Sequence, residues 1–198
     1  YGDWSSDVCS SDLALAVHPE HGMISHITYI MAYCHFQLEQ FEDALEKFGL
    51  VYTKYAEHGY AEPAQYWHAM AQLFLTRYTP AREEFAAFIK KYGASDLAAD
   101  ASYRYGVAYY GEGNFPAAAK ALREFIQKYP KNLVVSEAWT MIGDILASEA
   151  KLDEAAAAYN SGIATFQTMP QLNLATFQCA RVFELEQRWD DIIALCQD

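Results

Sequence analysis

A single alanine position recurs every 37 residues along most of this chain, and its neighbours recur with it. The alanines are Ala44, Ala81, Ala118 and Ala155. The residue twelve positions earlier is always small and the residue four positions later is always large: the pairs are Ala32 with Phe48, Ala69 with Phe85, Gly106 with Leu122, and Gly143 with Tyr159. One more step of 37 places Ile192 at the alanine position. Self-similarity at a period of about 20–50 residues predicts a stacked array in which each unit buries its apolar face on the next.

Each unit has the pattern of two helices joined by a short turn. In the third unit an apolar period near 3.6 ends at Tyr110, breaks in GEGN and resumes after it. Asn114 is predicted to cap the second helix, with Pro116 in its first turn, and Pro130 is predicted to stop it. Lysines that match the helix dipole close the second helices: Lys54, Lys91 and Lys128.

These residues resemble the tetratricopeptide repeat (TPR) family, whose pattern is an aromatic residue, Leu-Gly and Tyr in a first helix, then Ala, Phe and Pro in a second. The fourth unit carries most of this pattern, in Trp139, Ile142, Gly143, Leu146, Ala155 and Tyr159. The resemblance implies an all-α fold, a right-handed α-solenoid of antiparallel two-helix repeats. We expect the repeats at about 25–61, 62–98, 99–135, 136–172 and, truncated, 173–198. The 37-residue units ending in KYG and KYP are similar to those of bacterial envelope TPR proteins, such as Tol-Pal coordinators and outer-membrane assembly lipoproteins.

The N-terminal residues do not fit the repeat pattern. Residues 2–13, GDWSSDVCSSDL, resemble a translated sequencing-library adapter, so we interpret residues 1–13 as a non-native leader. Pro19 lies three periods before Pro130, which predicts that residues 14–24 hold the end of a truncated preceding repeat and a linker.

Composition and motifs argue against several function classes. The formal net charge is −12, or −9 without the three aspartates of the leader, and an acidic surface disfavours nucleic acid. No apolar run approaches the roughly 18 residues of a membrane span. The loop GEGNFPA joins two helices and so does not match a phosphate-binding turn, and no nucleophile elbow or Walker lysine is present. We therefore predict no enzymatic activity and no cofactor. The resemblance to bacterial envelope TPR proteins implies a periplasmic or outer-membrane-associated location more than a cytoplasmic one.

The cysteines and histidines do not form a recognisable reactive or metal-binding motif. Cys34 is predicted to be a small core residue. Cys179 and Cys196 occupy apolar positions that face each other across the last helix pair, and are either two buried thiols or a disulfide. No metal site is predicted, because His18, His21 and His26 lack the spacing of metal ligands. His35 and His68 are predicted to be satisfied interior residues.

The predicted function is therefore binding. In the TPR family the first helices line a concave groove, with ligand contacts fifteen, eleven and eight positions before the recurring alanine. In the first three units these positions hold mainly aromatic and apolar residues: Tyr29, Tyr33, Phe36, Tyr66, Met70, Leu73, Tyr103, Val107 and Tyr110. In the last two units they are more polar: Thr140, Asp144, Ala147, Phe177, Arg181 and Glu184. An aromatic groove suits a helix or an extended peptide of a protein partner.

Three functions fit this prediction. The first is a non-catalytic protein-interaction scaffold in a bacterial multiprotein assembly, the second is the regulatory or substrate-recruiting TPR segment of a larger enzyme, and the third is a lipid-anchored envelope assembly factor. At the level of the residues, the alternative to a groove is that the tyrosines on the first helices form shared core. The sequence does not identify the partner.

Overall fold

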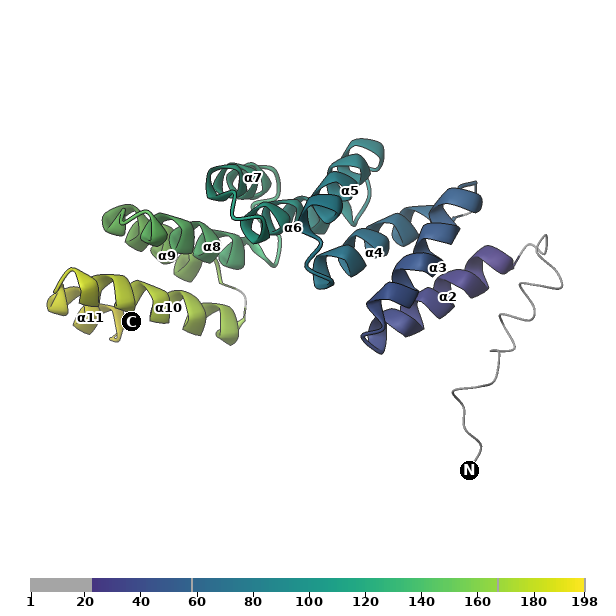
Figure 1. Ribbon diagram of the computed structural model, residues 1–198. Helices are drawn as coiled ribbons and strands as arrows, with labels where there is room; N and C mark the ends of the chain where they lie inside the picture. The colour runs from purple at the N-terminus through teal and green to yellow at the C-terminus, as the bar shows by residue number, and fades with distance from the viewer. Residues whose placement is uncertain (1–22, 58, 167, 198) are drawn as a thin grey trace, which may run out of the picture. The chain divides into compact units, whose positions relative to one another are not determined.

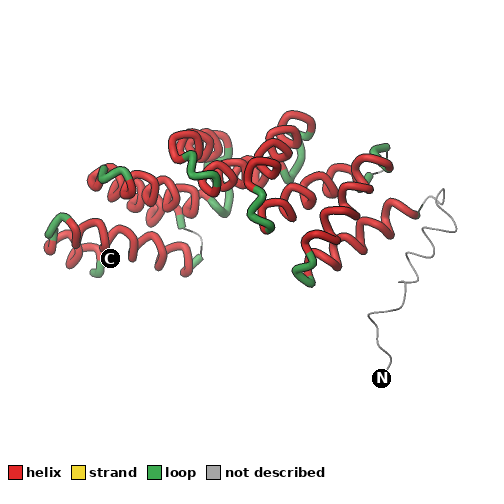
Figure 2. Tube along the Cα trace, in the orientation of Figure 1, coloured by secondary structure: helices red, strands yellow, loops and turns green. Residues whose placement is uncertain are grey.

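The computed structural model describes residues 23–57, 59–166 and 168–197, and every regular element in these ranges is an α-helix (Figures 1 and 2). The predicted all-α fold of two-helix repeats is confirmed. The predicted leader, Pro19 and the histidines at 18 and 21 lie outside the described residues.

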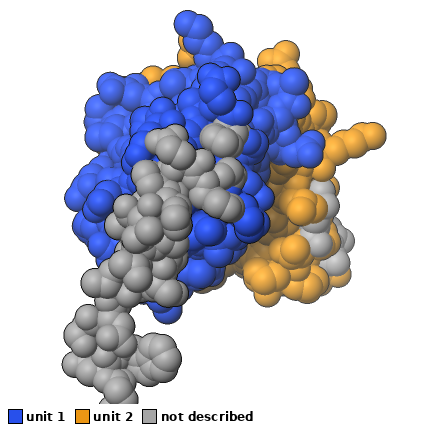
Figure 3. Space-filling model, turned by 90° about the vertical axis from the view of Figure 1, so that its right-hand side faces the viewer, with its two compact units in different colours: residues 1–97 blue, residues 98–198 orange. Residues whose placement is uncertain are grey.

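The chain divides into two compact units, one ending at Leu97 and the other beginning at Ala98 (Figure 3). The described helices of the first unit are α2 (Ile24–Gln37), α3 (Phe41–Lys54), α4 (Ala61–Phe74) and α5 (Tyr78–Lys91). Those of the second are α6 (Ala98–Gly111), α7 (Phe115–Lys128), α8 (Val135–Ser148), α9 (Leu152–Thr165), α10 (Met169–Leu185) and α11 (Trp189–Leu195).

The helix boundaries follow the 37-residue period. The first helices α2, α4, α6 and α8 begin at residues 24, 61, 98 and 135, and the second helices α3, α5, α7, α9 and α11 begin at 41, 78, 115, 152 and 189. One helix departs from the period: α10 begins at Met169, three residues earlier than its register position. Thr168 and Gln171 form a capping box there, which satisfies free N–H groups and extends the helix.

The two helices of each repeat meet through the small and large residues of the period. Ala32, Ala69 and Gly106 are buried, as are their partners Phe48 and Phe85. A Cβ atom added at Gly106 would lie 2.7 Å from Leu122 Cδ2, and one added at Gly143 would lie 2.7 Å from Tyr159 Cζ. The helices approach so closely in these two repeats that only glycine fits without rearrangement.

The turn between first and second helix has the same conformation in every repeat. In the third repeat Asn114 N–H donates to Tyr109 O at 3.0 Å, and Gly113 has a φ of 75°. This is the Schellman turn, in which a residue in the left-handed region ends the helix. The equivalent backbone hydrogen bond and a positive φ recur at 37-residue intervals. The φ angles lie between 56° and 60° at Glu39, Thr76, Ala150 and Gln187.

The second helices begin and end as the sequence predicts. The Asn114 side chain accepts a hydrogen bond from Ala117 N–H at 3.3 Å, which confirms the predicted cap, and α7 ends before Pro130. Three lysines stand in the last turns, where each ammonium group lies over the ring of the following tyrosine; the lysine-to-ring distances are 5.4 Å at Lys54, 4.8 Å at Lys91 and 5.0 Å at Lys128. These contacts help to fix the loop that leads to the next repeat.

Candidate functional site

The predicted groove residues of α2 lie where this helix packs on α4. The Tyr33 and Phe36 rings meet the Trp67 ring edge to face, with centroids 5.2 and 5.0 Å apart. Phe36 is buried, while Tyr29 and Tyr33 are partly exposed. Burial raises the pKa of Tyr29, and a hydrogen bond from the Trp67 indole opposes that shift. These three rings therefore join two neighbouring repeats, and only two of them keep exposed surface.

The predicted groove residues of α4 are mainly interior. Tyr66 is 5% exposed, and its ring lies 6.2 Å from Phe85 and 5.9 Å from Phe88, both on α5. Met70 is also 5% exposed, and Leu73 is partly exposed. Tyr66 and Met70 thus contribute to the core of the first unit.

The predicted residues of α6 are placed in the same mixed way within the second unit. Tyr103 is 7% exposed and packs on Phe125 at 5.7 Å, and burial raises its pKa to about 12. Val107 packs against the same core and stays partly exposed. Tyr110 is partly exposed beside Phe115. Of the nine predicted residues, Phe36, Tyr66, Met70 and Tyr103 are buried, as the shared-core alternative expects, and the other five retain accessible surface.

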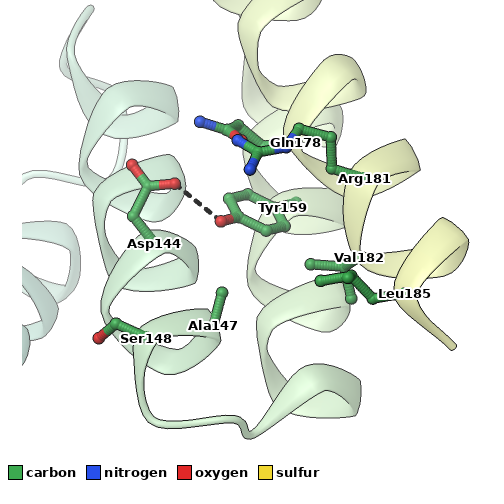
Figure 4. Close-up of a pocket in the computed structure, with 8 residues that line it drawn as sticks. All are labelled: Asp144, Ala147, Ser148, Tyr159, Gln178, Arg181, Val182 and Leu185. Atoms are coloured by element: carbon green, nitrogen blue, oxygen red, sulfur yellow. Dashed lines mark hydrogen bonds between the residues drawn. The ribbon is translucent and has the colours of Figure 1, made fainter.

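A pocket of about 290 Å³ lies on the second unit, between the first helices α8 and α10, with α9 beneath them (Figure 4). Its lining residues are Asp144, Ala147 and Ser148 from α8, Tyr159 from α9, and Gln178, Arg181, Val182 and Leu185 from α10. Asp144, Ala147 and Arg181 occupy groove positions of the fourth and fifth repeats. The pocket therefore lies at groove positions of the fourth and fifth repeats, whereas the predicted groove residues belong to the first three repeats.

Tyr159 and Asp144 form the fixed part of this pocket. The Tyr159 hydroxyl donates a hydrogen bond of 2.7 Å to Asp144 Oδ1 (Figure 4). Desolvation raises the pKa of Asp144, and the Tyr159 hydrogen bond and the charge of Arg181 oppose this shift. Desolvation and the hydrogen bond to Asp144 both raise the pKa of Tyr159. The pair therefore presents a partly buried carboxylate in a defined orientation.

Arg181 stands on the opposite wall of the pocket, across the Tyr159 ring from Asp144 (Figure 4). Its Nη1 donates to Gln178 Oε1 at 3.2 Å, and its guanidinium carbon lies 5.9 Å from the Phe177 ring centre. Among the described residues no ion pair within 4.0 Å joins Arg181 to Asp144. The pocket thus carries two opposite charges on separate walls, with apolar surface beside them from Ala147, Val182 and the 70% exposed Leu185.

A comparison with protein-family models identifies the fold family. The tetratricopeptide repeat model matches residues 66–133 and again residues 111–170, together more than half of the chain. The chain belongs to the tetratricopeptide repeat family. The family implies protein partners, and TPR proteins are in general non-catalytic scaffolds.

Solved structures show the same TPR fold at low sequence identity. A MamA protein superposes with a TM-score of 0.70 at 19% identity, over 89% of this chain and 90% of that one. The TPR-like repeats of a putative kinesin light chain from Podosopora anserina give 0.67 at 16% identity, over 90% and 94%. MamA from Desulfovibrio magneticus RS-1 gives 0.66 at 16%, over 87% and 89%. No curated protein sequence matches significantly.

The three cysteines within the described residues are free thiols, and two of their predicted positions are wrong. Cys34 is exposed, although it was expected in the core, because no described helix precedes α2; the equivalent Ala71 is buried where α4 packs on α3. Cys196 follows the last residue of the short α11 and is also exposed. Cys179 is buried, and burial raises the pKa of its thiol to about 11.

His68 and His35 both have hydrogen-bonding partners, as predicted, but both are partly exposed and not fully interior. His68 Nδ1 lies 2.5 Å from Glu84 Oε2, and Gln72 donates to the same carboxylate at 2.8 Å. His35 Nδ1 lies 2.7 Å from Gln40 Oε1. Within the described ranges no group of three metal-ligating side chains comes together. None of the helices described there has the length and apolar character of a bilayer-spanning segment.

Proposed function

We propose that this TPR chain is a non-catalytic interaction scaffold that binds a short peptide or helix of a partner protein on its first helices. The observation that supports this most directly is the pocket between α8 and α10. It lies at groove positions of the repeat, it is open to solvent, and it combines apolar surface with a carboxylate and a guanidinium on separate walls. Such a pattern of an apolar pocket with a few convergent polar groups is typical of a binding site.

Fixed geometry also favours binding. Tyr159 is 2% exposed and hydrogen bonded to Asp144, so the floor and one wall of the pocket are ordered before any partner arrives. A preformed site loses less conformational entropy on association. Tyr110 contributes a further partly exposed ring on α6; burial raises the pKa of its hydroxyl, and the charge of Asp144 adds to this shift.

The pocket contains the groups for recognition but lacks those for acyl-transfer or hydrolytic chemistry. Asp144 is held by a tyrosine and Ser148 donates to the backbone oxygen of Ile145 at 2.6 Å, so neither forms a nucleophile–base pair. The buried Cys179 thiol, with its raised pKa, is a poor nucleophile near neutral pH.

Selection of peptides on the purified full chain tests this proposal. A random peptide library displayed on phage would be selected against the immobilised chain, and the recovered peptides would be measured by fluorescence polarisation. We expect the exposed variant Arg181→Glu to weaken binding at least about tenfold, a change of about 1.4 kcal/mol. Arg123→Glu is the matched control, because Arg123 is exposed on the second helix α7. Failure to recover any peptide that binds the chain in solution would refute the proposal.

We further propose that the scaffold works in a bacterial multiprotein assembly at the cell envelope. This rests on the 37-residue units with KYG and KYP endings and their similarity to envelope TPR proteins. Fractionation of cells that carry the intact gene, with the product followed by immunoblotting, would test it. Recovery of the product only with the cytoplasmic fraction would refute the location.

A further inference from the structure

We infer that the pocket between α8 and α10 recognises an uncharged carboxamide side chain, glutamine or asparagine, of the bound peptide. The inference rests on the proposed function and adds the chemistry of the ligand. It follows from three features of the pocket: its balanced charges, the free hydrogen-bonding capacity of those charges, and its size.

The charges exclude a charged ligand group. One carboxylate and one guanidinium face the cavity from opposite walls, and they are not paired with each other. An acidic side chain would pair with Arg181 but bring a second negative charge near the partly desolvated Asp144. A basic side chain would pair with Asp144 but bring a second positive charge near Arg181. A neutral but strongly dipolar group avoids both repulsions.

The hydrogen-bonding capacity favours a group that both donates and accepts. Asp144 Oδ1 faces the pocket and accepts from Tyr159, and a carboxylate oxygen can accept a second hydrogen bond. Arg181 uses Nη1 for Gln178, and a guanidinium has five N–H donors in total. A carboxamide offers two N–H donors to Asp144 and a carbonyl oxygen to Arg181. A purely apolar side chain would bury both charges without partners, which carries a large penalty.

The size and the apolar wall fit one such side chain. The cavity of about 290 Å³ is large enough for a single amino-acid side chain and some of its backbone. Ala147, Val182 and Leu185 lie beside the polar groups and can contact the methylene groups of glutamine. Leu185, 70% exposed, also offers a contact to an apolar neighbour in the peptide.

The test uses peptides recovered from the random library on the full chain. We expect glutamine or asparagine at one fixed position, next to apolar residues. In synthetic copies of the best peptide, replacing that residue by methionine, glutamate or lysine should each weaken binding about tenfold or more.

Two chain variants make the test specific to the pocket. Asp144→Asn removes the negative charge and keeps an acceptor for Tyr159. The affinity of the glutamate peptide should therefore rise relative to that of the lysine peptide. Arg181→Gln removes the positive charge, so the affinity of the lysine peptide should rise relative to that of the glutamate peptide. Absence of this crossed pattern, or equal affinity of the methionine and glutamine peptides, overturns the inference but leaves the proposed scaffold standing. If no library peptide binds at all, the proposed function itself fails.

Discussion

Replacing Gly143 by alanine should destabilise the second unit, although alanine is the better helix former. Gly143 is buried in α8, and an added Cβ would lie 2.6 Å from Cδ1 and 2.7 Å from Cζ of Tyr159. These atoms belong to a rigid ring that is 2% exposed and tied by its hydroxyl to Asp144. The ring must therefore shift as a whole, and the hydrogen bond to Asp144 is strained or lost.

Two costs and one gain determine the expected change in the free energy of unfolding. Overpacking a close helix contact costs about 1–3 kcal/mol. Loss of a hydrogen bond to a charged group costs about 1.5–3 kcal/mol, and the gain in helix propensity from glycine to alanine returns about 1 kcal/mol. We expect the free energy of unfolding to fall by about 1.5–5 kcal/mol in the Gly143→Ala chain.

Two controls separate the clash from the general effect of the substitution. Gly49 lies inside α3, and its added Cβ would be 3.5 Å from the His68 ring, an ordinary contact distance. Gly49→Ala should therefore stabilise the chain by about 0.5–1 kcal/mol. In a Tyr159→Ala background the ring is absent, so Gly143→Ala should be neutral or stabilising there.

The measurement is urea unfolding followed by far-ultraviolet circular dichroism, with total tryptophan fluorescence, to which Trp139 of α8 contributes, as a second probe. Midpoints and slopes would be compared for the four chains of the Gly143 and Tyr159 cycle. An equal cost of Gly143→Ala with and without the Tyr159 ring would refute the reasoning, because the clash would then not be its cause.

Three further predictions concern the turn, the pocket and the buried thiol. Thr76→Gly should raise the free energy of unfolding by about 0.5–1 kcal/mol, because threonine at φ 56° is strained, whereas Gly113→Ala should lower it by about 1 kcal/mol; urea unfolding measures both. Folding raises the pKa of Asp144, so ionisation of its carboxylate removes stability as the pH rises through the folded pKa. The Asp144→Asn chain should therefore gain stability relative to the parent chain as the pH rises from 3 to 7. Equal pH profiles of the two chains would contradict this. In a Cys9→Ser chain, Ellman's reagent should titrate two thiols at once and Cys179 only after unfolding, and immediate reaction of all three would show that Cys179 is not buried.

The repeat period predicted the helices well because it records packing between neighbouring helices, not merely local preference. Small residues such as Gly106 and large ones such as Leu122 must alternate wherever two helices cross closely, so the contact itself is visible in the sequence. The turns were less visible. Only Gly113 has the residue expected at a positive φ, while Thr76 and Ala150 adopt the same conformation because the flanking helices impose it.

The candidate site was harder to predict than the fold. An aromatic residue at a groove position has the same sequence pattern whether it faces solvent or the next repeat. Tyr33 and Phe36 illustrate this, since both pack on Trp67 of the following first helix. Whether the five accessible aromatic and apolar residues bind a partner stays a prediction.

The pocket forms in a repeat where a groove position on the first helix is polar and the large core residue on the second helix differs from that of the first two repeats. In the first two repeats the large partner on the second helix is Phe48 or Phe85, which needs no hydrogen bond. In the fourth repeat it is Tyr159, whose hydroxyl reaches the surface of α8 and bonds to Asp144. The hydrogen bond offsets only part of the desolvation, because the pKa of Asp144 remains raised. A phenylalanine at this position with an apolar residue on α8 would satisfy the core at less cost, as the second repeat does with Phe85 and Met70. The polar pair is therefore not explained by stability, and its position on the open face between α8 and α10 supports the proposal that it serves recognition.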